Sequence, residues 1–558
     1  MGAGSLGDFA TAHRTTLDKA LAAIAARTHF SAYPEMPSGK IYGETAKTDG
    51  EAAFRALQGG RFDLGTQAES WVGEEVSPWG PALGITYPAA SPDTLVARAE
   101  AARGAWAEAE PAIRAGICLE ILHRLNRDSF LMANAVMHTS GQAFIMAFQA
   151  GGPHAQDRGL EAVAYAMREM GAVPGAVRWE KPAGKDVLAL DKRFRLVPRG
   201  IGLVIGCATF PTWNSYPGLF ASLVTGNAVI VKPHPAAVLP LAITVRTARA
   251  VLAEAGFAPD VVQLAPDTQA APIAQALALH PAVGIVDFTG GPSFGRWLRE
   301  NIGAGKALYT EEAGINPVVL HSTADFAGLC RNLAFSLALY SGQMCTAPQN
   351  IFVPAEGIET NEGRKSFEEV GTAVAKALDK LLSDPERAAG VLGAIVNPAT
   401  MARIAEARGL GRVVRDSAPV EAPGFPAARM ATPLLVQVEA DACGAWGEER
   451  FGPIAFLIRT GSAEEALHFA AGSARARGAI TALVHSTDEA FLGRAERAFA
   501  AAGVALSENL TGGIFVNQSA AFSDYHVSGA NPAGNACLTD SAFVANRFRI
   551  AMTRRQAA

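Results

Sequence analysis

Strand-like and helix-like runs alternate through the middle of the chain, and this alternation limits the possible fold more than any other feature. The strand-like runs are apolar and rich in β-branched residues, as expected for strands that are buried on both faces. They lie at 201–206, 228–231, 261–264 and 283–288, with helix-like runs at 219–224 and 240–255. Alternation of this kind is typical of a parallel sheet covered by helices on both faces. The sequence therefore predicts an α/β fold.

The second half of the chain repeats this rhythm. Helices are predicted at 365–383, 399–407, 463–473 and 488–502, and strands at 351–353, 433–437, 454–458, 480–484 and 514–517. A chain of 558 residues is longer than one ordinary domain, and 49% of it is hydrophobic, which is enough for more than one core. We therefore expect a second parallel-sheet domain.

Two segments do not follow the buried pattern. Residues 183–199 alternate apolar and charged side chains, which predicts an exposed two-stranded ribbon, and residues 543–552 alternate in the same way and predict a last strand. An isolated ribbon is only marginally stable in water. Something should therefore cover it.

Charge and cysteine usage exclude several classes of protein. The formal net charge of −5 leaves no basic footprint for nucleic acid. The six cysteines show neither a C-x-x-C pair nor metal-ligand spacing, so we expect reduced thiols in a cytoplasmic protein and no metal site. No apolar run reaches the length needed to span a bilayer, and the first residues do not resemble a signal peptide.

One cysteine lies where a nucleophile would be useful. Cys345 follows a Ser-Gly-Gln turn, between a helix-like run and the strand-like run Ile351–Val353. Glu311 lies 34 residues upstream and could supply a base to form the reactive thiolate. From spacing alone the signal is weak, because most cysteines are small core residues, and packing in the core is the more common explanation.

Five motifs say more about function than the spacing of Cys345 and Glu311 does. They are E-E-A-G-I-N-P from Glu311, G-Q-M-C-T-A-P around Cys345, G-N-A-V-I-V-K-P at 226–233, F-T-G-G-P-S-F-G at 288–295 and E-E-R-F-G-P at 448–453. In sequence, order and rough spacing they resemble the aldehyde dehydrogenase superfamily, over about residues 90 to 530.

The resemblance implies two parallel-sheet α/β domains and a small oligomerisation ribbon. A Rossmann-like cofactor domain with an N-terminal helical extension would comprise residues 1–182 and 200–311, and a catalytic thiol domain residues 312–535. Residues 183–199 and 536–558 would form the oligomerisation elements, covered by the partner subunit of a homodimer or homotetramer.

The resemblance also implies a dinucleotide site. Lys232 would bind the adenosine ribose with His234 nearby, Gly290 and Gly295 would flank a phosphate-binding turn, and Glu449 would hold the nicotinamide ribose beside Phe451. The family often has an acidic residue three positions after the lysine, but here K-P-H-P places Pro235 there. Because a carboxylate would repel a 2′-phosphate, its loss favours NADP over NAD.

The implied chemistry is oxidation of an aldehyde to the acid. Cys345 would form a thioester, and Glu311 would activate the water that hydrolyses it. A gap-free alignment places Thr209, 23 residues before Lys232, at the family's oxyanion-binding asparagine, whereas Asn214 in T-W-N is the alternative. Either would act together with the Cys345 backbone N–H.

Other motifs resemble a narrower branch of the family. A-T-F-P-T-W-N-S-Y-P and the segment around D-Y-H-V-S-G are similar to the aldehyde dehydrogenases of bacterial phenylacetic acid degradation, which implies a ring-opening semialdehyde linked to coenzyme A. Two alternatives remain. One is a non-catalytic member of the fold that serves as a binding or assembly subunit, and the other is a cysteine thioesterase or transferase without net oxidation.

Overall fold

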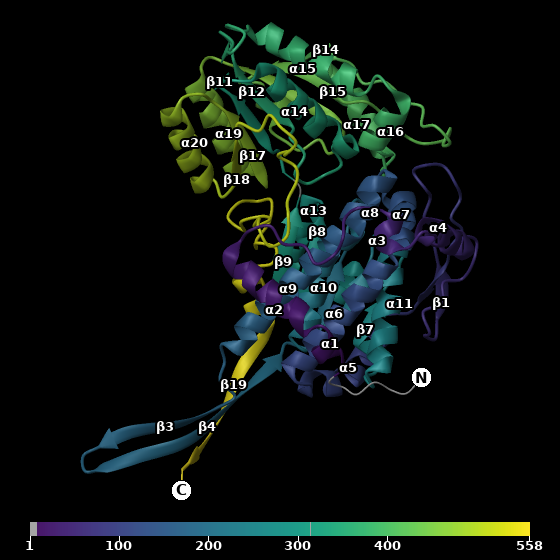
Figure 1. The fold of residues 1–558 in the computed structure, drawn as a ribbon, viewed down its shortest axis with the longest axis vertical. Coiled ribbons are helices and arrows are strands. Elements are labelled where there is room, and N and C mark those ends of the chain that lie inside the picture. Colours follow the sequence, from purple (N-terminus) through teal and green to yellow (C-terminus); the bar gives the residue numbers. More distant parts are fainter. Residues whose placement is uncertain (1–7, 313, 558) are drawn as a thin grey trace.

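Two parallel sheets covered by helices build the protein, and a long antiparallel ribbon projects from one of them (Figure 1). The computed structural model describes residues 8–312 and 314–557. The first sheet is entirely parallel, in the order β7–β6–β5–β8–β9. Its strands are β5 (Ile201–Ile205), β6 (Ala228–Lys232), β7 (Val262–Leu264), β8 (Val283–Gly290) and β9 (Ala307–Glu312). The predicted α/β class is confirmed.

Helices cover both faces of this sheet because successive strand residues point to opposite sides. Leu203 packs in one hydrophobic cluster and Val204 in another. The Leu203 face is covered by α5 (Pro92–Glu108), α12 (Ala274–Leu279) and α13 (Pro292–Asn301). The Val204 face is covered by α6 (Pro111–Arg127), α9 (Pro153–Gly171), α10 (Pro211–Val224) and α11 (Leu239–Glu254).

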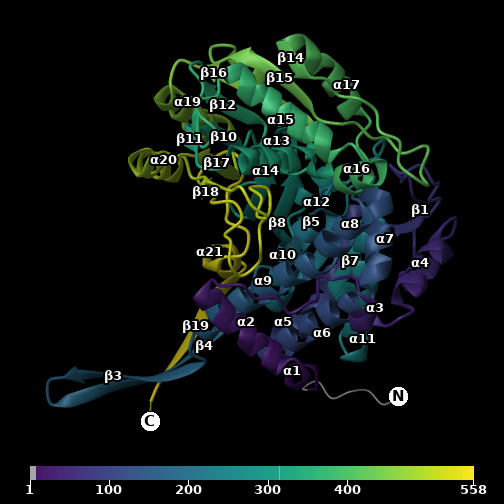
Figure 2. The ribbon, with the colours of Figure 1, turned by 45° about the horizontal axis from the view of Figure 1, so that its top comes forward.

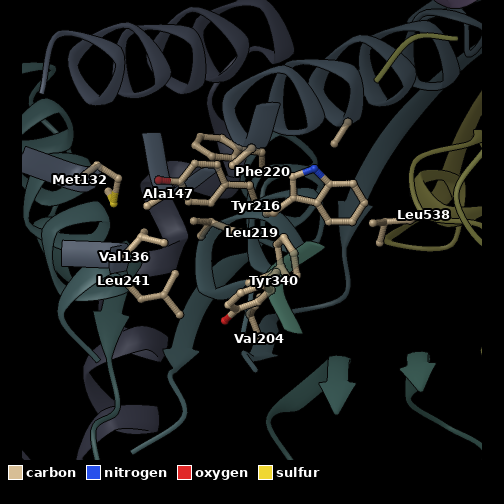
Figure 3. Close-up of a cluster of buried hydrophobic side chains, with 14 of the residues drawn as sticks. Met132, Val136, Ala147, Val204, Tyr216, Leu219, Phe220, Leu241, Tyr340 and Leu538 are labelled. Carbon is tan, nitrogen blue, oxygen red and sulfur yellow. The ribbon is translucent and has the colours of Figure 1, made fainter. Parts of the chain in front are cut away.

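Helix α10 is longer than the sequence pattern predicted. It begins at Pro211 and not at Leu219, so the T-W-N motif forms its first turns. A proline suits the first helical position because it lacks only an N–H that has no intrahelical partner. Tyr216, Leu219 and Phe220 of this helix are completely buried and pack together in the core (Figure 3).

The second sheet has the order β14–β15–β16–β12–β10–β17–β18 and is parallel except for β14. Its strands are β10 (Pro317–Leu320), β12 (Asn350–Pro354), β14 (Arg412–Arg415), β15 (Leu434–Glu439), β16 (Ile454–Thr460), β17 (Thr481–His485) and β18 (Ala505–Glu508). The helices are α14 (Phe326–Ala338), α15 (Phe367–Leu381), α16 (Pro385–Leu392), α17 (Ala399–Ala407), α18 (Cys443–Trp446), α19 (Ala463–Arg477) and α20 (Glu489–Ala501). The two-residue strands β11 (Ser322–Thr323) and β13 (Glu359–Thr360) pair separately.

The strand predicted at 514–517 is wrong, because the last strand of this sheet is β18. The Asn332 side chain donates to the carbonyl oxygens of Gly512 and Ile514, at 3.1 and 2.8 Å. These carbonyl groups are therefore bound by a side chain from α14 and not by a neighbouring strand.

The projecting ribbon has three strands, β3 (Ala176–Ala183), β4 (Asp186–Pro198) and β19 (Phe548–Gln556), in the order β19–β4–β3 (Figure 2). The prediction of a two-stranded ribbon within 183–199 is therefore wrong: that segment supplies one strand, whose partners are β3 and the chain's tail. The tail strand also begins later than predicted, since Asp540 caps the short helix α21 (Ser541–Ala545).

The N-terminal extension wraps the first sheet's helices. Its elements are α1 (Asp8–Ala12), α2 (Arg14–Ala26), α3 (Gly39–Tyr42), α4 (Ala46–Leu57), β1 (Ser70–Val72) and β2 (Tyr87–Ala89), and α7 (Ser129–Ser140) and α8 (Phe144–Gly151) lie between α6 and α9. Arg27, just after α2, donates to Glu161 of α9 at 2.9 Å. Among the helices described, none has the length and apolar character needed to cross a membrane.

Candidate active site

A tight turn positions Cys345 between α14 and β12. After α14 the chain forms the 3-10 helix η2 (Leu339–Gly342), in which Tyr340 and Ser341 both have φ of 51°, in the left-handed region. Such a conformation costs on the order of 1–3 kcal/mol per residue and persists only where the surroundings impose it. Here the Tyr340 hydroxyl donates to Ser140 O, and Ser341 Oγ donates to Leu392 O at 3.0 Å.

Cys345 meets Glu311 and a histidine that sequence reasoning missed. The Cys345 Sγ donates to Glu311 Oε1 at 3.2 Å. His526 Nε2 lies 3.1 Å from the same oxygen and 3.9 Å from the sulfur. Asn214 Nδ2 donates to the other carboxylate oxygen at 3.1 Å. The structure thus places one side chain from α10 and two from loops around the Glu311 carboxylate of β9.

The protonation of the pair follows from these contacts. Burial raises the pKa of Glu311, but the charge and hydrogen bond of His526 and the hydrogen bonds of Cys345 and Asn214 outweigh it, so the pKa lies below its usual value. Burial, and then the Glu311 charge, raise the pKa of Cys345 well above its usual value, with further contributions from Cys207 and Glu449. The resting pair is therefore a thiol that donates to a carboxylate.

The two oxyanion candidates lie in different surroundings. The Thr209 hydroxyl donates toward Cys207 Sγ at 3.8 Å, and its carbonyl oxygen accepts from Gln142 at 2.8 Å. Asn214 is buried in the first turn of α10, and its amide reaches Glu311 directly. Asn214 therefore joins the Cys345 cluster directly, whereas the Thr209 hydroxyl reaches it only through Cys207, whose thiol donates to Asn214 Oδ1 at 3.7 Å.

Lys232 ends β6 at the carboxyl edge of the first sheet, where open α/β sheets bind ligands. Lys232 is 5% exposed, and its ammonium group pairs with Asp267 Oδ1 at 2.5 Å. His234 is neutral near pH 7, because burial lowers its pKa to about 4. The strand order reverses between β5 and β8, which is the usual position of a dinucleotide at such an edge.

The glycines after β8 differ from the prediction. Gly290 ends the strand, but α13 begins at Pro292, so Gly295 lies inside the helix and not before it. A Cβ on Gly295 would lie 2.2 Å from Glu312 Oε1, whereas one on Gly291 would meet nothing within 4 Å. Gly295 therefore makes room for Glu312, and Gly290 for the Phe288 ring, which a Cβ would meet at 2.7 Å. Gly291 leaves an open approach to the helix N-terminus that suits a phosphate.

Glu449 lies near enough to Cys345 for its charge to raise the pKa of the thiol, and the half-buried Phe451 follows it closely in the chain. Burial raises the pKa of Glu449 to about 8, although Arg403 and the Gly314 N–H both lower it. A neutral or charged carboxyl here can bond ribose hydroxyls. Together with Lys232 and the open approach at Gly291, it fits a dinucleotide that spans from the sheet edge to the thiol.

His526 lies in the D-Y-H-V-S-G motif, but the sequence alone gave it no role. It lies 181 residues after Cys345, within a loop that returns from the second sheet to the first (Figure 2). The ring of Trp213 meets it edge-on at 4.7 Å between centroids, and the Arg158 guanidinium lies 5.1 Å from the Trp213 ring. Only the tertiary fold brings these residues together.

Comparison with known proteins agrees with this geometry. The aldehyde dehydrogenase family matches residues 85–534. The N-succinylglutamate 5-semialdehyde dehydrogenase of Burkholderia cenocepacia (strain HI2424) is 27% identical over 413 residues, or 72% of this chain and 76% of that protein. The protein of the same name from Paraburkholderia xenovorans (strain LB400) is 29% identical over 275 residues, 48% of this chain, and the match spans about half (53%) of that relative.

Among solved structures, an NAD-dependent aldehyde dehydrogenase from Burkholderia multivorans is 54% identical, with a TM-score of 0.97 and 99% of both chains covered. A 1-pyrroline-5-carboxylate dehydrogenase from Thermus is 20% identical, with a TM-score of 0.73 over 95% of this chain and 99% of that one, and shares the fold. The chain therefore belongs to the aldehyde dehydrogenase family and is an enzyme that uses NAD or NADP.

Proposed function

We propose that this enzyme oxidises a semialdehyde to the carboxylic acid, with Cys345 as nucleophile and Glu311 as base. The observation that carries the proposal is the 3.2 Å hydrogen bond from the Cys345 thiol to the Glu311 carboxylate. Glu311 lies at the carboxyl end of β9 in the first sheet, and Glu449 is close enough to Cys345 to act on its pKa.

The geometry supports the following sequence of steps. Glu311 takes the thiol proton, and the Cys345 sulfur attacks the aldehyde carbon to give a tetrahedral adduct. The bound nicotinamide supplies a hydride acceptor. Cys345 then holds a thioester, and Glu311, once it has released its proton, activates a water that frees the acid.

For the oxyanion donor, the contacts support Asn214 better than Thr209. An amide nitrogen carries two hydrogens, and only one of those on Asn214 is needed for Glu311. The second is free to bond the oxyanion beside Cys345. We expect Asn214→Ala to lower kcat about a hundredfold and Thr209→Val to lower it less than tenfold, in steady-state assays. A larger loss of kcat in Thr209→Val than in Asn214→Ala would identify Thr209 as the oxyanion donor.

A carboxylate does lie beside Lys232, at the predicted adenosine-ribose site. Pro235 offers no acceptor there, but Asp267 Oδ1 lies 2.5 Å from Lys232 Nζ. Because the Asp267 carboxylate would repel a 2′-phosphate, we propose that NAD is preferred over NADP. Asp267→Asn should improve kcat/KM for NADP relative to NAD, and an unchanged ratio would contradict this.

Two semialdehyde classes remain as candidates. The sequence motifs favour a coenzyme A-linked semialdehyde from ring opening in phenylacetate degradation, whereas the curated relatives carry the name of N-succinylglutamate 5-semialdehyde. Both have an aldehyde at the end of an anionic chain. A panel that contains both, with short unsubstituted aldehydes as controls, should show the highest kcat/KM for one of the two anionic substrates.

Cys345→Ala is the decisive control for that panel. It should abolish oxidation while the variant still binds the dinucleotide, because the sulfur does not hold the cofactor. Cys207→Ser is the matched variant, since Cys207 lies nearby and should be dispensable. Turnover of Cys345→Ala near the wild-type rate would refute the proposal.

The alternatives make different predictions. A thiol beside a histidine and a carboxylate is also the arrangement of a thioester hydrolase, so the Cys345–His526–Glu311 cluster supports that second candidate. Such an enzyme would release acid from a thioester without reducing the nicotinamide. A non-catalytic assembly subunit would do neither.

A further inference from the structure

Besides Glu311, the polar side chain next to the Cys345 thiol is His526, to which the proposed reaction steps give no role. It is 3% exposed, and its backbone is fixed by the Leu538 N–H, which donates to His526 O at 2.8 Å. The edge of Trp213 limits the ring on one side. Its Nε2 is within hydrogen-bonding distance of Glu311 Oε1 and, at 3.9 Å, near the limit for Cys345 Sγ.

Proton transfer from Cys345 to Glu311 moves the negative charge from Glu311 Oε1 to Cys345 Sγ, two atoms 3.2 Å apart. Before transfer the anion is the carboxylate, and after it the anion is the thiolate. The thiolate is formed in unfavourable surroundings, because Cys345 is buried and burial disfavours a negative charge on its sulfur. Among the described residues, no lysine or arginine is hydrogen-bonded to the sulfur, and Arg158 lies behind Trp213.

We propose that His526 is a catalytic residue that stabilises both anions in turn, by shifting its Nε2–H hydrogen bond from Glu311 to Cys345. As the S–H bond breaks, an O–H bond forms on Glu311 Oε1, and the imidazole keeps its own proton throughout. The total charge of the three groups is unchanged. This role rests on the proposed function, in which Cys345 is the nucleophile and Glu311 its base.

The test measures the thiol directly and needs neither aldehyde nor cofactor. Alkylation of Cys345 by iodoacetamide is followed by mass spectrometry across pH 6–10 in wild type, His526→Met and His526→Gln. Methionine fills the space without a donor, whereas glutamine keeps an N–H of similar reach. We expect His526→Met to slow alkylation at pH 7.5 by about tenfold and to raise the midpoint of the pH profile. His526→Gln should stay within about threefold of wild type.

Equal slowing in both variants, or no slowing in either, would overturn the proposal. If His526 acted only through packing or through its charge, replacing it with a side chain that has an N–H donor or with one that lacks it would have the same effect. His526→Asn, whose amide is one carbon shorter, should behave like His526→Met and serves if the methionine variant does not fold. His468→Gln, on the exposed face of α19, is the control. If wild type oxidises no aldehyde, the proposed function fails, but the alkylation profiles still decide the role of His526.

Discussion

Three segments of the chain donate hydrogen bonds to the Glu311 carboxylate, which is 4% exposed. These bonds hold its pKa low in spite of burial, so the group is ready to accept a proton at neutral pH. Asn214 holds one oxygen, which leaves the other directed at the thiol. At the scale of single residues, the site is therefore a carboxylate positioned as a base.

Replacing that base should separate the two halves of the reaction. We expect Glu311→Gln to give at most one equivalent of reduced nicotinamide per active site and then to stall, because the thioester is not hydrolysed. Rapid-mixing absorbance at 340 nm measures the burst. Glu448→Gln, an exposed neighbour of Glu449, is the control and should turn over steadily. Steady turnover of Glu311→Gln would remove Glu311 from deacylation.

The raised pKa of Glu449 makes the stability of the folded protein depend on pH. That pKa is about 8 in the folded protein and about 4.5 when unfolded. The folded state therefore keeps a proton that the unfolded state releases, so stability falls as pH rises from about 4.5 through 8 and levels off above. We expect Glu449→Gln to flatten the decrease of Tm between pH 5 and 8, as measured by scanning calorimetry. An identical slope in both proteins would contradict the shift.

At the scale of elements, α13 packs against β9 through a glycine. The buried Glu312 of β9 pairs with Arg299 of α13, directly where a side chain at Gly295 would lie. An added methyl group must displace this ion pair, and overpacking of this kind typically costs about 1–3 kcal/mol. This contact sets how closely the helix approaches the strand that carries Glu311.

Gly295→Ala should therefore lower the free energy of unfolding by about 1–3 kcal/mol and weaken dinucleotide binding. Gly291→Ala is the matched variant, since its Cβ meets nothing within 4 Å, and it should cost less than about 1 kcal/mol. Urea unfolding measures the first effect and cofactor fluorescence the second. Equal stabilities of the two variants would show that the ion pair moves aside freely.

Element types were largely predictable from sequence, because buried parallel strands read as apolar runs. Element partners were not. The 514–517 segment has strand-like composition, yet the Asn332 side chain donates to the Ile514 carbonyl oxygen in place of a neighbouring strand. Similarly, alternation revealed that β4 is exposed, but pairing with β3 and with the distant tail depends on register, which alternation does not encode.

At the scale of the whole molecule, the ribbon leaves apolar side chains in solvent. They are Val177, Val187, Leu188, Val197, Ile550 and Met552, each at least 38% exposed. The two outer strands, β3 and β19, also present unpaired edges. Such edges and patches are usually covered by another chain.

We therefore expect at least a dimer through the ribbon. Val187→Asp combined with Leu188→Asp should shift the mass in solution toward the monomer, measured by light scattering at micromolar concentration. Ile41→Asp, a 49% exposed residue of α3 far from the ribbon, should leave the mass unchanged. A wild-type monomer with full activity would contradict the prediction.

The sequence by itself determined the α/β class, the family resemblance, and Cys345 and Glu311 as partners, because these depend on local composition and on motifs in a fixed order. The tertiary structure alone decided that His526 joins them, that Asp267 faces Lys232 and that Asn214 lies closer to the base than Thr209. Contacts between residues far apart in the chain depend on how sheets and loops pack, and no local pattern records that packing.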